Sequence, residues 1–183
     1  MNSFRCTYVQ IANVRADLPE AARCLVWVGW GAPSCTYLTP VFGSQTRFAD
    51  HFGKGLRAEY DPESGWWNEA IVQQTATINY ASAIEDIKAV RDPKMAKVYK
   101  QTAAAQEFAA SLIELGMEDL AVDYLTNYAV NTANSWFDTY KQLGDDLTTK
   151  YMLGNVNMKV PARSDWWRDI VWSNMGDKLR PEN

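Results

Sequence analysis

Three cysteines and a single histidine are the residues of this sequence that could carry nucleophilic chemistry. They are Cys6, Cys24, Cys35 and His51. A thiol becomes a useful nucleophile when a base or a positive charge converts it to thiolate. The cysteines lie in or beside β-like runs, whereas His51 lies in a glycine-rich loop beside Asp50. We interpret the cysteines as buried strand residues and His51 as a surface loop residue, with a hydrolase that pairs His51 with Cys35 as an alternative.

The sequence has no recognised spacing for a metal or a cofactor. Its three cysteines form no CxxC pair, and the one histidine adds a single further ligand. Zinc sites need several such ligands at short spacings. Gly29 and Gly31 flank Trp30 without a GxGxxG or Gly-Lys-Ser/Thr pattern, which favours a tight turn over a phosphate-binding loop. We therefore predict no cofactor and no metal.

Paired carboxylates and paired tryptophans are further candidates for chemistry or binding. The acidic pairs at 118–119 and 145–146 lie in helix-like segments, where carboxylates are usually solvated or cap the helix. The tryptophan pairs at 66–67 and 166–167 could stack on sugars or bases. Because Ile and Val recur beside them at helical spacing, we interpret the tryptophans as core anchors.

Three short apolar runs predict an antiparallel meander at the start of the chain. They cover 6–15, 24–30 and 36–42, are rich in β-branched and aromatic residues, and are joined by connections with Gly and Pro. The run at 24–30 is apolar at nearly every position, as expected of a strand that is covered on both faces. One of its faces is therefore expected to meet helices or a second sheet.

The rest of the chain has helical periodicity. A stripe that begins with Trp66 and Trp67 continues at three- and four-residue steps through Ile87. Asp92 followed by Pro93 is typical of a helix start, and the next apolar stripe stops at Gly116. A third helix is predicted over 125–154 and a short terminal one over 164–175.

Length and composition favour one globular domain of the α+β class over 1–183, with a β-meander over 4–42 and a mainly helical part over 62–175. Of the 183 residues, 47% are hydrophobic and 22% charged.

The net charge of -4 is the wrong sign for a nucleic-acid partner. The longest apolar stretch, 24–30, is far shorter than a membrane span, and cysteine usage without a disulfide framework suits the cytoplasm.

Three runs of the predicted sheet, at 15–19, 26–33 and 37–42, have a characteristic order and spacing. They resemble the C-terminal part of the bacterial cysteine dipeptidases of the dipeptidase A type. The tryptophan pair at 66–67 with 72–74 is similar to the family helix that follows the sheet, and 125–151 resembles its long closing helix. Together these matches cover nearly the whole chain.

This resemblance implies an N-terminal nucleophile hydrolase with a four-layer αββα sandwich. In such an enzyme the amino-terminal cysteine attacks the peptide carbonyl of a dipeptide, its own α-amino group is the base, and an acyl-enzyme forms. The resemblance begins well inside the family's sequence, so the nucleophile is expected outside this chain and the chain alone is expected to be inactive. Arg15 is a candidate clamp for the substrate carboxylate; the alternative is an exposed arginine paired with Asp17.

The partners implied are the dipeptide substrate, the N-terminal half of the enzyme and, because a half-sandwich exposes one sheet face, a second copy of the chain. Neither nucleic acid nor a membrane is expected as a partner. The alternative function is a non-catalytic binding or assembly module that uses a tryptophan-rich surface.

Overall fold

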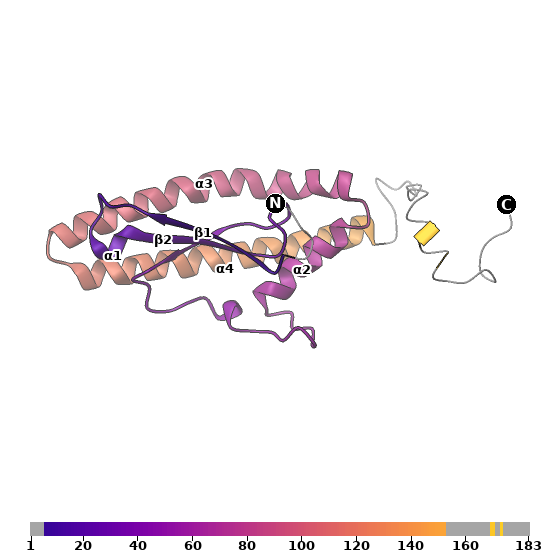
Figure 1. Ribbon diagram of the computed structural model, residues 1–183, viewed down its shortest axis with the longest axis horizontal. Helices are drawn as coiled ribbons and strands as arrows, with labels where there is room; N and C mark the ends of the chain where they lie inside the picture. The colour runs from indigo at the N-terminus through magenta and orange to yellow at the C-terminus, as the bar shows by residue number, and fades with distance from the viewer. Residues whose placement is uncertain (1–5, 153–168, 171–172, 174–183) are drawn as a thin grey trace.

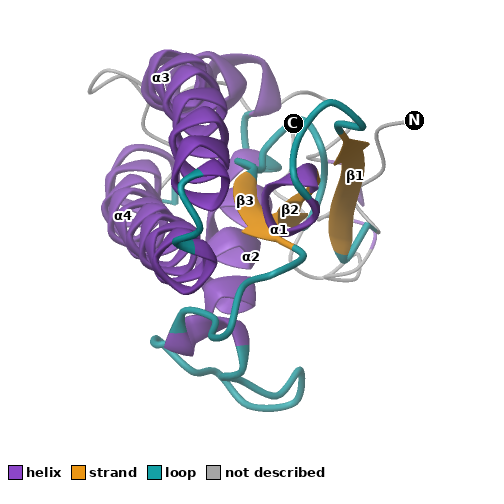
Figure 2. Cartoon of the chain, turned by 90° about the vertical axis from the view of Figure 1, so that its left-hand side faces the viewer, coloured by secondary structure: helices purple, strands orange, loops and turns teal. Residues whose placement is uncertain are grey.

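The computed structural model describes residues 6–152, 169–170 and 173, and it confirms an α+β fold. Three strands, β1 (Tyr8–Val14), β2 (Cys24–Trp30) and β3 (Thr39–Phe42), form an antiparallel sheet in the order β1-β2-β3. Long helices follow the sheet along the chain (Figure 1). In the end-on view β3 lies nearest α3 and α4, and β1 is at the far edge of the sheet (Figure 2).

The strand connections differ from the prediction at two places. A one-turn helix, α1 (Glu20–Arg23), lies between β1 and β2. β3 begins at Thr39 and not at position 36. The reason is that the residues before Thr39 bond to helices instead of continuing the ladder: the Leu38 N–H, for example, donates to Met95 Sδ at 3.4 Å.

The longer helices are α2 (Gly65–Ala76), α3 (Tyr80–Glu114) and α4 (Glu118–Tyr151), and a 3-10 turn, η1 (Asp50–Phe52), precedes them. The stripe predicted as one helix over 66–87 is therefore divided between α2 and α3. The predicted terminal helix at 164–175 lies mostly outside the described residues, of which Asp169, Ile170 and Ser173 are helical.

The prediction that Asp92 and Pro93 begin a helix is wrong, because Pro93 lies inside α3. Proline lacks the N–H that would bond to the carbonyl four residues earlier, here that of Ala89. Both Ala89 and Pro93 are exposed, so water can satisfy that carbonyl and the helix continues. The predicted stop at Gly116 follows the last residue of α3 by two positions; Gly116 has φ 76°, and the Met117 N–H donates to the Leu112 carbonyl at 2.9 Å.

Aromatic side chains from the sheet region and α4 form the centre of the core. Tyr37 stacks on Trp136 with ring centroids 4.8 Å apart and meets Tyr140 edge-on at 4.6 Å. β2 buries Leu25 and Trp27 toward this core, while the residues between them are half-buried. The expected two-sided cover of β2 is thus complete on one face and partial on the other. None of the described helices is long and apolar enough to cross a lipid bilayer.

Gly29 gives a direct test of how closely the chain packs beside the sheet. A Cβ at this position would lie 2.2 Å from the Tyr37 carbonyl oxygen. The Tyr37 backbone would have to move to make room for this Cβ. We therefore expect Gly29→Ala to lower the free energy of unfolding by about 1–3 kcal/mol in urea denaturation. A Cβ at Gly53 would meet nothing closer than 4.0 Å, so the control Gly53→Ala should stay within about 0.5 kcal/mol. Equal losses in the two variants would contradict this packing.

Candidate functional site

The segment 31–38, which connects β2 to β3, is held in place by polar groups of α2. We call it the anchored loop. The Ala32 N–H donates to Gln73 Oε1 at 2.7 Å. Gly31 begins the loop with φ 76°, and a Cβ there would lie 2.6 Å from the same Gln73 oxygen. Glycine is therefore required at this turn both by its backbone conformation and by the close approach of Gln73.

Glu69 is the second polar group of α2 that bonds to the anchored loop. Its side chain is only 2% exposed, and Glu69 Oε1 lies 2.6 Å from Thr36 Oγ1. Burial raises the pKa of this carboxyl well above its ordinary value, against the opposing effects of hydrogen bonds from Thr36 and the Tyr37 N–H and of the charge of Arg91. The carboxyl is therefore held in its neutral form well above the pH at which glutamate usually ionises.

The hydrogen-bond geometry agrees with a neutral Glu69. Thr36 Oγ1 also lies 2.9 Å from the Tyr37 carbonyl oxygen, which can only accept. A hydroxyl has one hydrogen to donate, so it cannot serve both the carbonyl and a carboxylate. A protonated Glu69 resolves this conflict, because it donates to Thr36 Oγ1 while Thr36 donates to Tyr37.

Two further helices bond to the backbone of the anchored loop. Arg91 on α3 donates from Nη1 to the Ser34 carbonyl at 2.5 Å and pairs with Asp92 at 2.7 Å. Tyr140 on α4 donates its hydroxyl to the Cys35 carbonyl at 2.9 Å. The loop is thus fixed by α2, α3 and α4 together, which makes it a rigid wall.

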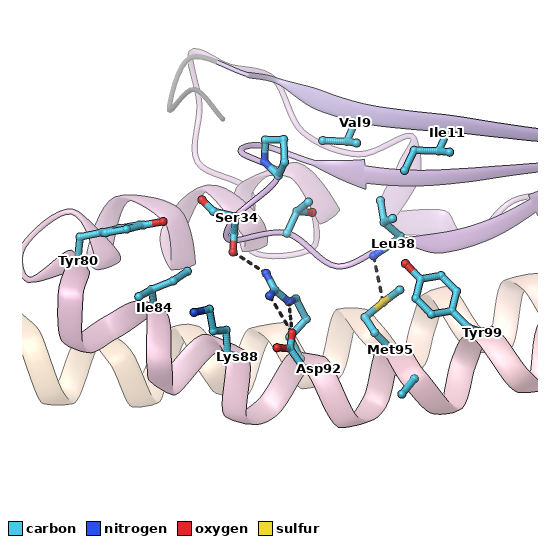
Figure 3. A pocket seen from close by; sticks show the side chains of 14 residues that line it. Val9, Ile11, Ser34, Leu38, Tyr80, Ile84, Lys88, Asp92, Met95 and Tyr99 are labelled. Atoms are coloured by element: carbon cyan, nitrogen blue, oxygen red, sulfur yellow. Dashed lines mark hydrogen bonds and ion pairs between the residues drawn. The ribbon is translucent and has the colours of Figure 1, made fainter. Parts of the chain in front are cut away.

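A groove of about 680 Å³ lies between this wall, β1 and α3 (Figure 3). β1 contributes Val9 and Ile11, the loop contributes Leu38, and α3 contributes Ile84 and Met95. These side chains make an apolar surface of the kind that binds small organic groups.

The polar part of the groove lies where α3 faces the start of the loop. Lys88, Arg91 and Asp92 line it beside Ser34 (Figure 3). Lys88 pairs with Glu85 at 2.9 Å on the exposed surface, where such a pair is weak. The polar end of the groove thus holds the Arg91–Asp92 ion pair and the ammonium of Lys88.

Within the described part of the chain, none of the three cysteines is hydrogen-bonded to a basic side chain. Cys35 is 1% exposed, and burial raises the pKa of its thiol, so the thiolate is disfavoured. Its Sγ lies 3.6 Å from Ser34 Oγ, which is not a base. Cys6 and Cys24 are half-buried free thiols. Cys35 is buried, as predicted, but it lies in the anchored loop and not in a strand.

The prediction that His51 is a surface residue is wrong, since it is 6% exposed. Its ring packs against Phe52 and Phe137, at 5.0 and 4.7 Å between centroids. Burial lowers the pKa of the imidazole, and Asn134 bonds to it. His51 Nε2 has no hydrogen-bond partner within the described part of the chain. No hydrogen bond in that part links His51 to Cys35, so the structure gives no support to the alternative His51–Cys35 pair.

Arg15, the predicted carboxylate clamp, lies just beyond β1 and bonds to two acidic side chains. Its Nη2 is 2.5 Å from Asp17 Oδ2, and its Nη1 is 2.6 Å from Glu107 Oε1. The hydrogen bonds to Asp17 and Glu107 raise the pKa of the guanidinium. The pairing with Asp17 is the alternative considered above, and a role of Arg15 in substrate binding stays a prediction.

The interpretation of the tryptophan pair on α2 as core anchors is wrong. Trp66 and Trp67 are half-buried and meet edge-on at 4.8 Å, and Trp67 Nε1 donates to the Leu56 carbonyl at 3.0 Å. The buried face of α2 carries Glu69 and Gln73 instead. The pair at 166–167 lies outside the described residues.

Sequence reasoning missed Glu69, Gln73 and Arg91, the residues that hold the anchored loop. The available signal was the spacing of Glu69, Val72, Gln73 and Ala76, which share one helix face. A mixed face of this kind is ordinarily assigned to solvent, because glutamate is rarely buried without a partner. Among the described residues no group of His, Cys, Asp or Glu could hold a metal ion.

The sheet, the anchored loop and the groove form an α+β scaffold in which no described cysteine is hydrogen-bonded to a base. The model of peptidase family C69 matches residues 2–92, which include the sheet, the loop and α2. This part of the chain is a region of peptidase family C69, the family of dipeptidase A-type cysteine peptidases, and the resemblance is confirmed there. A search of the curated proteins finds no match.

Glu69 predicts an unusual dependence of stability on pH. Since its folded-state pKa is raised, the folded chain binds the proton more tightly, and stability is lost as pH rises from the ordinary glutamate range toward the folded pKa. Glu69→Gln replaces the neutral carboxyl with a neutral amide. We expect its Tm at pH 8 to exceed that of the unmodified chain by about 2–4 °C, the shift that about 1 kcal/mol produces at this size.

The control is Glu63→Gln, an exposed carboxyl 3.6 Å from Lys141, which should leave the Tm profile between pH 4 and 9 unchanged. Parallel profiles for Glu69→Gln and the unmodified chain would show that Glu69 is ionised in the folded state.

Proposed function

We propose that this chain forms part of a cysteine dipeptidase of the bacterial dipeptidase A type, and that the nucleophilic cysteine is supplied by polypeptide outside this sequence. The observation that carries the proposal is a peptidase family C69 region in which none of the described cysteines is hydrogen-bonded to a basic side chain. Cys35 in particular has its thiol pKa raised by burial. A peptidase region without its own nucleophile needs one from elsewhere.

In the proposed reaction an amino-terminal cysteine attacks the peptide carbonyl of a dipeptide. Its own α-amino group takes the thiol proton, the amine product leaves, and water hydrolyses the acyl-enzyme.

This chain contributes the groove, whose apolar part is matched to a substrate side chain. Its polar part, with Lys88, is matched to the substrate carboxylate. Arg15 is a second candidate for that carboxylate, provided that the substrate replaces Asp17 or Glu107.

The αββα sandwich is part of the same proposal. One face of the sheet packs on helices, while Val26, Val28 and Trp30 on the other face of β2 are only half-buried. A second sheet stacked on this face would bury them, as in sheet-on-sheet packing. The free thiols suit a reducing compartment, so the cytoplasm is the proposed location.

Complementation tests this proposal. The purified chain is mixed with the amino-terminal region of a peptidase family C69 dipeptidase that begins with cysteine, and release of leucine from leucyl-leucine is measured. We expect at least a 100-fold rise over either part alone, because only the mixture holds both nucleophile and groove. Replacing the supplied amino-terminal cysteine with serine should abolish the rise.

Cys24→Ser in this chain is the matched control and should leave the restored activity unchanged, since Cys24 is not the nucleophile. Hydrolysis by the chain alone that is lost on replacing Cys6, Cys24 or Cys35 would place the nucleophile in this chain. Binding of the two parts without activity would favour the assembly module.

A further inference from the structure

The outer edge of β1 is a strand edge to which no other described strand is paired. Its hydrogen-bonding direction follows from two contacts with the neighbouring segment: the Gly31 N–H donates to the Thr7 carbonyl at 3.0 Å, and the Arg15 N–H donates to the Arg23 carbonyl at 3.1 Å. In an antiparallel ladder such paired residues recur at every second position. Odd-numbered residues of β1 therefore direct their backbone groups to β2, and the even-numbered ones direct theirs outward.

Within the described residues, the outward edge carries neither the charges nor the proline that commonly protect an edge strand. Natural proteins place charges, proline or bulges on such edges to prevent pairing with another chain. β1 is seven residues long and contains neither a charged residue nor a proline. Its exposed apolar side chains include Tyr8, Ile11 and Val14, which are 58%, 50% and 62% exposed. Arg15, beyond its end, is already paired with acidic side chains.

We propose that this edge pairs with the same edge of a second copy of the chain, in an antiparallel dimer whose two-fold axis passes beside Ile11. This register pairs all seven residues of both strands. Tyr8 then faces Val14 and Gln10 faces Ala12 of the second copy in hydrogen-bonded pairs, since these are the outward-directed residues. No like charges meet anywhere along the pairing.

The side chains of the two strands also suit this register. Tyr8 beside Val14 is an aromatic and β-branched pair, a combination that stabilises adjacent strands. Ile11 faces Ile11 of the second copy in a non-hydrogen-bonded pair, where side chains approach most closely. Because Ile11 also lines the groove (Figure 3), the axis lies beside the groove of each copy, and the three-stranded sheet becomes a continuous six-stranded one.

Cysteine cross-linking in the full chain tests the register. Under mild oxidation, Ile11→Cys should give a covalent dimer on a non-reducing gel well above the level of the unmodified chain. Val9→Cys alone and Asn13→Cys alone should not exceed that level, whereas a mixture of these two variants should, because position 9 faces position 13 of the second copy. Failure of Ile11→Cys to cross-link, or equal cross-linking by all variants, would overturn the proposal.

Sedimentation of two variants, each with one exposed apolar side chain replaced by aspartate, tests whether the β1 edge is the dimer surface. Ile11→Asp places like charges opposite each other at the axis and should raise the dimer dissociation constant at least tenfold. Phe108→Asp is the control, because Phe108 is also 50% exposed but lies on α3; it should sediment as the unmodified chain does. A chain that is monomeric at all concentrations would overturn the proposal.

The amino-terminal region used for complementation separates this proposal from the proposed function. If the unmodified chain still self-associates in sedimentation when that region restores activity, the edge belongs to the second copy. If the region suppresses this self-association, its own strand occupies the edge and the dimer is overturned, while the dipeptidase proposal stands.

Discussion

The desolvation of one carboxyl, that of Glu69, is the constraint on which the arrangement of this chain depends. A buried ionised carboxylate is costly unless it is fully paired, and the bonds from Thr36 and Tyr37 do not offset that cost. The Glu69 carboxyl is tolerated in the interior because its neutral form can both donate and accept a hydrogen bond. Together with the bond from Ala32 to Gln73, this chemistry holds α2 against the anchored loop.

The position of these ties explains why the sheet is covered unevenly. The anchored loop bonds to α2, α3 and α4 at the β2–β3 connection, which is the side of the sheet nearest α3 and α4 (Figure 2). Among the described residues, the comparable tie near β1 is that of Arg15, just beyond the strand, to Glu107. The helices therefore pack tightly under β2 and β3 and leave a groove under β1. The groove and the unprotected edge of β1 have the same structural origin.

The sequence predicts the parts of this fold that depend on periodicity and local turns. The three strands follow from β-branched runs, and the end of α3 near Gly116 follows from the conformational freedom of glycine. Periodicity fails for α2, because tertiary hydrogen bonds bury Glu69 and leave Trp66 half-buried. It also fails at Pro93, where exposure of the freed carbonyl removes the penalty. The candidate site could not be predicted, because its anchors are polar residues that are remote in sequence.

A peptidase region whose described cysteines have no hydrogen-bonded base is chemically consistent with the proposed mechanism. In the proposed mechanism the nucleophile and its base both belong to one residue, the amino-terminal cysteine with its own α-amino group. The remainder of the enzyme then needs to bind and orient the dipeptide and need not supply a histidine or carboxylate base. His51 packs against an aromatic ring, and burial lowers its pKa, which favours the neutral imidazole. Burial likewise keeps Cys35 as a thiol. In this mechanism both residues contribute to packing and not to catalysis. If other polypeptide supplies the nucleophile, this chain needs a firmly held surface that binds the dipeptide, and the anchored loop beside the apolar groove provides one.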